Sequence, residues 1–111
     1  MIFTETVLKG AFLVEVKKIE DNRGFFGRAW CQQEFEDHAL MSRMVQASVS
    51  FNKYKGILRG LHFQTAPSKE AKLVRVTKGA IFDVIVDLRP DSSAFLKHYS
   101  VNLDQENHNA L

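Results

Sequence analysis

The longest regular pattern in the chain is a strict alternation of apolar and polar residues over residues 45–52. Its apolar positions are Val45, Ala47, Val49 and Phe51, and its polar positions are Gln46, Ser48, Ser50 and Asn52. Successive side chains of a β-strand point to opposite faces, so a period of two predicts a strand with one polar face. That face either meets solvent or lines a wet cavity inside a barrel.

Short runs rich in β-branched and aromatic residues predict further strands. They cover residues 12–17, 25–30, 57–63, 71–78, 80–89 and 99–103. A turn is predicted at residues 20–24, where Gly24 tolerates a positive φ, and a second, tight turn at Lys78 and Gly79. Residues 32–40 predict the one helix, a short amphipathic one, because Phe35 and Ala39 lie four residues apart with acidic residues between them.

About eight short strands and one helix predict an all-β fold, an antiparallel sandwich or barrel. The 111 residues leave room for one domain, residues 1–111. After the polar residues 104–109, a new strand could begin at Ala110 and Leu111. An open sheet edge there would invite pairing with another chain, so we expect a domain that is incomplete at its C-terminal end or completed by a partner.

Composition narrows the class of protein. Hydrophobic residues make up 45% and charged residues 25% of the chain, as in ordinary globular domains, and the net charge of +2 is too small to predict binding to nucleic acid or to a membrane surface. No apolar run reaches the roughly 18–20 residues of a membrane span, and the first residues lack a signal-peptide core. The lone cysteine, Cys31, cannot form an internal disulfide, so we expect a cytoplasmic protein.

Two basic residues lie inside predicted strands. His62 is either a packed, hydrogen-bonded core residue or a catalytic one. Lys72 shares a face with Val74 and Val76, so its side chain either points inward or extends along the sheet edge to solvent. A buried lysine is costly for stability, but its charge would stabilise a developing oxyanion.

Arg59 is a third basic residue in the same stretch. Strict alternation would place Arg59 and His62 on opposite faces of the strand. Gly60 lies between them and is a natural site for a bulge, which would redirect one of the two side chains.

A metal site is not expected. The spacing from Gly56 to His62 is similar to the pattern of metal-binding cupins, but that pattern needs a second histidine where this chain has Gln64. A neutral amide is a poor ligand for a transition metal, and Glu70 with one histidine does not make a site. A small metal-dependent cupin, such as a dioxygenase, is therefore only a further alternative.

Three motifs carry a family resemblance: DNRGFF at residues 21–26, KGILRGLHFQ at 55–64 and KLVRVTKGAIFDVIVDLR at 72–89. They closely resemble the dTDP-4-dehydrorhamnose 3,5-epimerase family, in register over residues 10–107. The resemblance implies an antiparallel double-stranded β-helix, the jelly roll of the cupin class. It also implies homodimers that act without metal or organic cofactor on nucleotide-linked 4-keto-6-deoxy sugars.

By this resemblance, His62 matches the catalytic base and Lys72 matches the residue that stabilises the enolate oxygen. The protons on C3 and C5 of a 4-keto sugar are acidic because the carbonyl delocalises the charge of the carbanion. Histidine titrates near neutral pH and can remove such protons.

The remaining candidates would hold the nucleotide sugar. Arg23, Gln46 and Arg59 match positions of the family that bind it, and arginine suits a diphosphate because its planar fork matches the phosphate oxygens. Ser48 joins them at a position where the family usually has asparagine, and Arg28 stands where it usually has glutamate. These two differences leave the preferred sugar or base open.

The sequence therefore predicts epimerisation at C3 and C5, or at C3 alone, of a dTDP-linked 4-keto-6-deoxyhexose in deoxysugar biosynthesis. The alternative is a catalytically incomplete homologue that binds a nucleotide sugar or dimerises. The resemblance implies that family members continue past this length. Their further residues include a tyrosine that returns a proton from the opposite face and an aspartate that pairs with the histidine.

Overall fold

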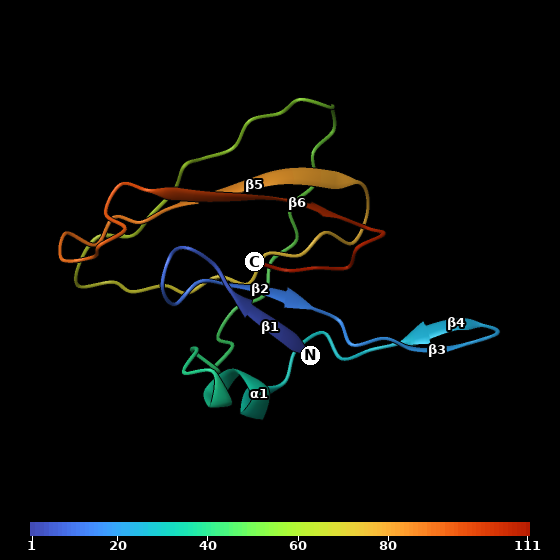
Figure 1. The fold of residues 1–111 in the computed structure, drawn as a ribbon. Coiled ribbons are helices and arrows are strands. Elements are labelled where there is room, and N and C mark those ends of the chain that lie inside the picture. Colours follow the sequence, from blue (N-terminus) through green and yellow to red (C-terminus); the bar gives the residue numbers. More distant parts are fainter.

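The longest strands form an antiparallel pair, β5 (Ala80–Val86) with β6 (His98–Asp104), in the computed structural model, which describes residues 1–111 (Figure 1). In this register Ile81 lies opposite Leu103, and Leu103 is fully buried. Neighbouring residues along a strand face opposite ways. Phe82 accordingly lies on the other face, where it is 68% exposed.

A second antiparallel pair lies beneath the first and consists of β1 (Ile2–Glu5) and β2 (Phe12–Glu15) (Figure 1). Its free edge is extended by Ala110, which bridges Val14 on one side and Arg75 on the other. Val14 and Ala110 exchange both backbone hydrogen bonds, at 2.8 and 2.9 Å. The last residues of the chain thus connect the N-terminal sheet to the segment around residue 75.

A third pair, β3 (Ile19–Asp21) with β4 (Gly24–Phe26), forms a hairpin that projects from the body of the molecule (Figure 1). Gly24 has a φ of 130°, a backbone conformation that side-chain-bearing residues rarely adopt, which explains glycine at this turn. The hairpin lengthens the molecule, whose extents are 50 × 38 × 26 Å.

The single helix, α1 (Gln32–Asp37), packs against β1 through aromatic side chains. The rings of Phe35 and Phe3 meet edge to face with centroids 5.4 Å apart, and His38 stacks on Phe3 at 4.0 Å. Edge-to-face and stacked pairs add to the stabilisation that burial provides. Phe35 is the one helical residue that is buried.

The buried core is small. Its apolar members come from β2, α1, β6, the connections between elements and the C-terminal segment. They are Leu8, Val14, Phe35, Val76, Ala94, Leu103 and Ala110. The carboxylate of Asp87 is buried with them.

Three of the predicted strands are wrong. Residues 45–52 and 57–63 make no backbone hydrogen bond to another segment, and residues 71–78 make only the isolated bridge at Arg75, with the backbone bonds between Val74 and Leu111 beside it. Alternation tells which side chains share a face, but a strand also needs a second strand beside it. None runs along residues 45–52, and Val49 is 97% exposed.

The other elements are confirmed, although several are shorter than predicted. The strands near residues 12–17, 80–89 and 99–103 form, as do the turn at residues 20–24 and the helix that begins at Gln32. The predicted strand at residues 25–30 is reduced to β4, and the predicted hairpin across Gly79 is absent because β5 pairs with β6 instead. No helix is long and apolar enough to cross a membrane.

Candidate functional site

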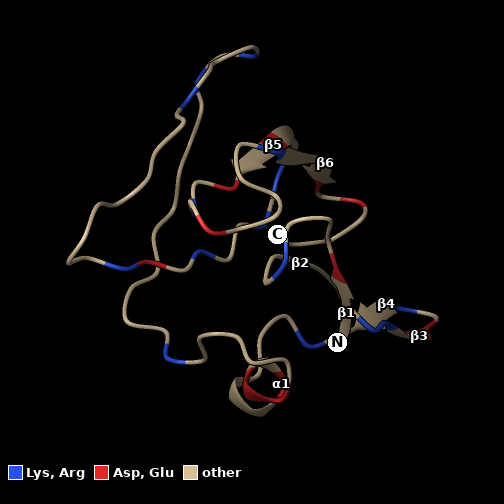
Figure 2. Ribbon diagram, turned by 60° about the vertical axis from the view of Figure 1, so that its left-hand side comes forward, with Lys and Arg blue, Asp and Glu red and all other residues tan.

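The six residues that the sequence singled out lie on two separate parts of the molecule. Arg23 lies at the tip of the β3–β4 hairpin. The other five lie on the long extended segment of residues 41–73, and they are Gln46, Ser48, Arg59, His62 and Lys72. In Figures 1 and 2 this segment and the hairpin leave the body in different directions.

Gln46 and Ser48 contact each other. The Gln46 Nε2 donates a hydrogen bond to the Ser48 Oγ at 3.1 Å, and both side chains are exposed. Residues two apart in extended chain point to the same side, so the alternation predicted this pairing correctly even though no strand forms.

Arg59 is held by the turn that precedes it. Its Nε donates to the Asn52 Oδ1 at 2.7 Å and its Nη2 to the Phe51 carbonyl at 3.1 Å. The Nη1 makes no protein hydrogen bond and is free for a ligand. Asn52, which orients Arg59, was not among the residues predicted for the site, although it belongs to the same polar row as Gln46 and Ser48.

His62 is exposed, and its ring lies close to the backbone of Gly60. A Cβ at position 60 would come within 3.6 Å of the His62 Nδ1, and Gly60 has a φ of 101°. Glycine tolerates both conditions because it has no side chain. The irregular backbone predicted at Gly60 is therefore present, but in a loop and not as a bulge in a strand.

Lys72 does not point inward. Its side chain is 51% exposed, and its Nζ lies 3.4 Å from the Glu70 Oε2. Without a paired strand around it, the lysine remains hydrated and meets a neighbouring carboxylate. Such an exposed ion pair contributes only about 0.2–1 kcal/mol, so it leaves the ammonium group free to rearrange toward a ligand.

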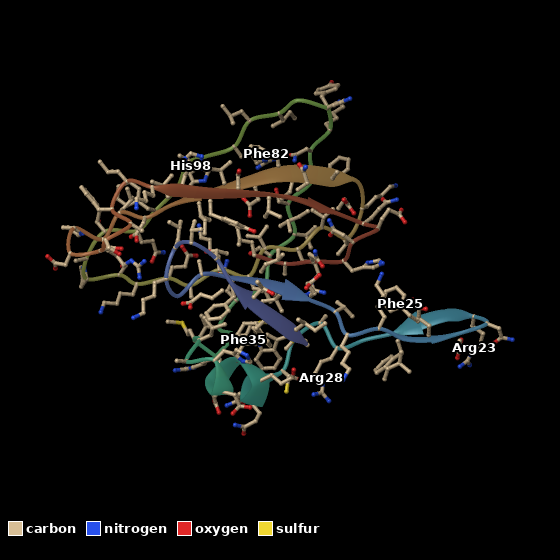
Figure 3. The ribbon with its side chains drawn as sticks, in the orientation of Figure 1. Arg23, Phe25, Arg28, Phe35, Phe82 and His98 are labelled. Atoms are coloured by element: carbon tan, nitrogen blue, oxygen red, sulfur yellow. The ribbon has the colours of Figure 1, made fainter.

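Arg23 is paired within its own hairpin. Its Nε lies 3.2 Å from the Asp21 Oδ2, and the guanidinium lowers the pKa of Asp21 through its side-chain hydrogen bonds. The Arg23 side chain is 85% exposed and extends away from the body (Figure 3).

Arg28 has an acidic neighbour in this chain. Its Nη1 donates to the Glu34 Oε1 at 2.7 Å. The pKa of Glu34 is lowered first by a hydrogen bond from the N-terminal amine of Met1 and then by Arg28. The cation at position 28 is thus balanced by a carboxylate of α1.

The structure does not bring the candidate catalytic residues into contact. No hydrogen bond or ion pair joins Arg59, His62 or Lys72 to one another. No group of three or more histidine, cysteine, aspartate or glutamate side chains is placed to hold a metal ion.

Comparison with known proteins identifies the family. The model of the dTDP-4-dehydrorhamnose 3,5-epimerase family matches residues 5–111. The chain belongs to this family. It is 41% identical to the dTDP-4-dehydrorhamnose 3,5-epimerase of Salmonella typhimurium over 114 aligned residues, covering 100% of this chain and 61% of that protein. The epimerase of Methanothermobacter thermautotrophicus is also 41% identical, over 95% of this chain and 56% of its own length.

Crystal structures of the family agree in fold. The dTDP-4-dehydrorhamnose 3,5-epimerase of Elizabethkingia anophelis matches with a TM-score of 0.93 and 38% identity, over 99% of this chain and 60% of that one. The Bacillus anthracis epimerase, solved with TDP and PPi bound, matches with a TM-score of 0.91 and 38% identity, over 98% of this chain and 62% of that one. The predicted cupin-like jelly-roll class is confirmed. The chain spans about three fifths of the length of these relatives.

Proposed function

We propose that this chain takes part in the epimerisation, at C3 and C5, of a dTDP-linked 4-keto-6-deoxyhexose. The observation that carries the proposal is the family match over residues 5–111. Catalysis proceeds by removal of the proton next to the ketone and its return to the opposite face of the sugar. The reaction belongs to deoxysugar biosynthesis.

His62 is the proposed base. Its ring is exposed, so a sugar can approach it, and a neutral imidazole is competent to accept a proton near neutral pH. General-base catalysis of this kind contributes roughly 10²–10⁴-fold in rate. Lys72 is proposed to donate a hydrogen bond to the enolate oxygen as negative charge develops there. To do so, its ammonium group leaves the Glu70 carboxylate and turns toward the substrate.

Four further residues are proposed to bind the nucleotide sugar. Arg59 offers its free Nη1 to the diphosphate, while the Asn52 side chain holds its Nε and the Phe51 carbonyl holds its Nη2. Gln46 and Ser48 present neighbouring polar groups on one side of the extended segment. Arg23 completes the set.

Hydrogen exchange with solvent tests the proposal. The chain is incubated in deuterated water with a dTDP-4-keto-6-deoxyhexose, and deuterium at C3 and C5 is measured by NMR. We expect label at both carbons in the wild type and none in His62→Ala. His98→Ala is the matched control, since His98 is exposed on β6 and lies outside the candidate residues (Figure 3).

Two outcomes would contradict the proposal. If the chain binds the nucleotide sugar but incorporates no deuterium at C3 or C5, it is a binding or dimerising domain and not an enzyme. Equal labelling by the wild type and His62→Ala would remove His62 as the base. Added EDTA is expected to leave the labelling unchanged, because no metal is proposed, and loss of labelling would overturn that part.

The position of Arg23 supports a homodimer. Arg23 lies on a hairpin that leaves the body away from the segment with His62 and Lys72 (Figures 1 and 2). The exposed apolar residues of this hairpin, Ile19 at 68% and Phe26 at 75%, would be covered by a second copy. We therefore propose that the hairpin of one subunit brings Arg23 to the site of its partner.

Mixing two inactive variants tests this arrangement. Arg23→Ala and His62→Ala are prepared separately and then mixed. If each dimer site combines residues of both subunits, mixed dimers contain one intact site and labelling returns. Mixing that restores no labelling, or a monomeric mass by light scattering, would contradict the arrangement.

We also propose a cytoplasmic location, because the single Cys31 is unpaired. Cell fractionation tests this location.

A further inference from the structure

Two adjoining cavities, both open to solvent, lie between the β1–β2 loop and the β5–β6 loop, and no residue of the proposed epimerase site lines either of them (Figure 1, blue and orange loops). The first has a volume of about 260 Å³, and most of its wall is apolar, with Leu8, Ala11 and Leu88 among its residues. The second has a volume of about 560 Å³ and is lined by Lys9 and by residues 89–93, none of them apolar apart from the proline ring.

Lys9 and Arg89 line both cavities, so the two spaces meet at a pair of cations. Arg89 is fixed there, because its Nε and Nη2 donate to the two oxygens of Asp87 at 2.8 and 2.7 Å. Its Nη1 makes no protein hydrogen bond and lies 4.0 Å from where a Cβ on Gly10 would be. The free donors of this guanidinium therefore lie over the β1–β2 loop, where the two cavities join.

The other charges nearby leave one ammonium group without a partner. Asp87 is buried, and its carboxylate accepts hydrogen bonds from the Arg89 guanidinium and the Ser92 hydroxyl. Glu5 accepts from the Gly10 N–H. Lys9 makes no hydrogen bond or ion pair, and Asp91 is the one acid that lines the polar cavity.

We propose that the two cavities together bind a small organic anion, a molecule that joins an apolar group to a phosphate or carboxylate. The apolar group occupies the first cavity. The anionic group extends into the second, where Lys9 and the Arg89 Nη1 donate to its oxygens and Ser93 supplies a hydroxyl at the rim. Preorganisation of Arg89 by Asp87 reduces the entropy lost when the anion is bound.

Phenyl phosphate is the probe, titrated at low ionic strength into the ¹⁵N-labelled 111-residue chain and followed by NMR. We expect saturable shifts at the amides of residues 8–11 and 85–93. Lys9→Gln should raise the Kd by roughly three- to tenfold, and Asp91→Asn should lower it by about two- to fivefold, since one removes an attraction and the other a repulsion. Lys78→Gln, an exposed lysine at a distant turn, is the matched control and should change nothing.

The opposite signs of the two variants separate binding from structural damage, which would weaken binding in both. Equal Kd values for wild type and Lys9→Gln, or weaker binding by Asp91→Asn, would overturn the proposal. So would shifts confined to residues 46–72, because the probe would then occupy the proposed epimerase site. Orthophosphate that binds as tightly as phenyl phosphate would overturn the role of the apolar cavity, and benzoate tests whether a carboxylate replaces the phosphate.

Discussion

The guanidinium of Arg89 donates two hydrogen bonds to the carboxylate of Asp87, although the two residues are only two positions apart in the chain. The same carboxylate accepts the Arg89 backbone N–H at 3.0 Å and the Ser92 hydroxyl at 2.6 Å. Backbone bonds between Asp87 and Leu96, and between Asp87 and Lys97, close the loop that follows β5. One buried acid thus organises the whole β5–β6 connection.

Stability should fall with acid because of Asp87. The hydrogen bond from the Arg89 side chain, followed by that from Ser92, holds the pKa of Asp87 well below its ordinary value. A carboxylate whose pKa is depressed by folding stabilises the protein above its unfolded pKa of about 3.9, and this contribution is lost as the pH falls from there toward the folded pKa. Urea unfolding at several pH values below 5 measures it.

The matched pair for this experiment is Asp87→Asn and Asp91→Asn. Asp87→Asn should lower the urea midpoint of unfolding at pH 7. The midpoint of this variant should also decrease less steeply below pH 4 than that of the wild type, because the titrating group is gone. Asp91 is exposed in the same loop, so its replacement should leave the curve unchanged. Parallel curves for the wild type and Asp87→Asn would refute the assignment.

Leu103→Ala should destabilise the chain by about 2–5 kcal/mol, since it removes a fully buried side chain from the inner face of β6. Leu58→Ala removes the same atoms from a side chain that is 91% exposed, and it should change the free energy of unfolding by less than about 0.5 kcal/mol. Chemical unfolding of both variants gives the comparison. Equal losses would mean that the core does not lie where the fold places it.

Gly27→Ala should destabilise by about 1–3 kcal/mol. A methyl group at this position would overlap the Val16 Cγ1 and lie 3.3 Å from the Lys17 carbonyl. Removing the obstructing methyls by Val16→Ala should reduce the added cost of Gly27→Ala. Thermal unfolding of the two single variants and the double variant checks this, and strict additivity would argue against the close contact.

Lys72→Met should lower kcat for deuterium incorporation by roughly 10²–10³-fold if Lys72 stabilises the enolate oxygen. Glu70→Gln removes only the exposed partner of Lys72 and should retain most of the rate. A kinetic assay of both variants separates the two roles. If Glu70→Gln is as impaired as Lys72→Met, the ion pair itself matters and the proposed role of Lys72 is wrong.

Local sequence signals predicted the parts of the fold that rest on local contacts. The turn at residues 20–24 and the start of α1 depend on glycine and on helical spacing, and both form where expected. The pairing of β5 with β6 is less local, and the local pattern instead predicted a hairpin between residues 71–78 and 80–89. Periodicity gives the faces of a strand but carries no information on its neighbour.

The same limit explains the candidate site. The alternation correctly placed Gln46 and Ser48 on one side, and Gly60 marked a real irregularity in the backbone. Whether Lys72 is buried depends on which strands surround it, which residues 71–78 do not encode by themselves. The burial of Asp87 could not be predicted from the sequence, because it arises from the loop in which Arg89 and Ser92 contact its carboxylate.

The position of Ala110 between Val14 and Arg75 has a consequence for biosynthesis. A ribosome adds ~5–20 residues per second, so β2 emerges of the order of 5–20 s before the residue that pairs with its free edge. During that interval the unpaired N–H and C=O groups of β2 are available to other nascent chains. Contacts of such large sequence separation also slow folding, so the yield of folded chains should depend on chaperones and on the rate of translation.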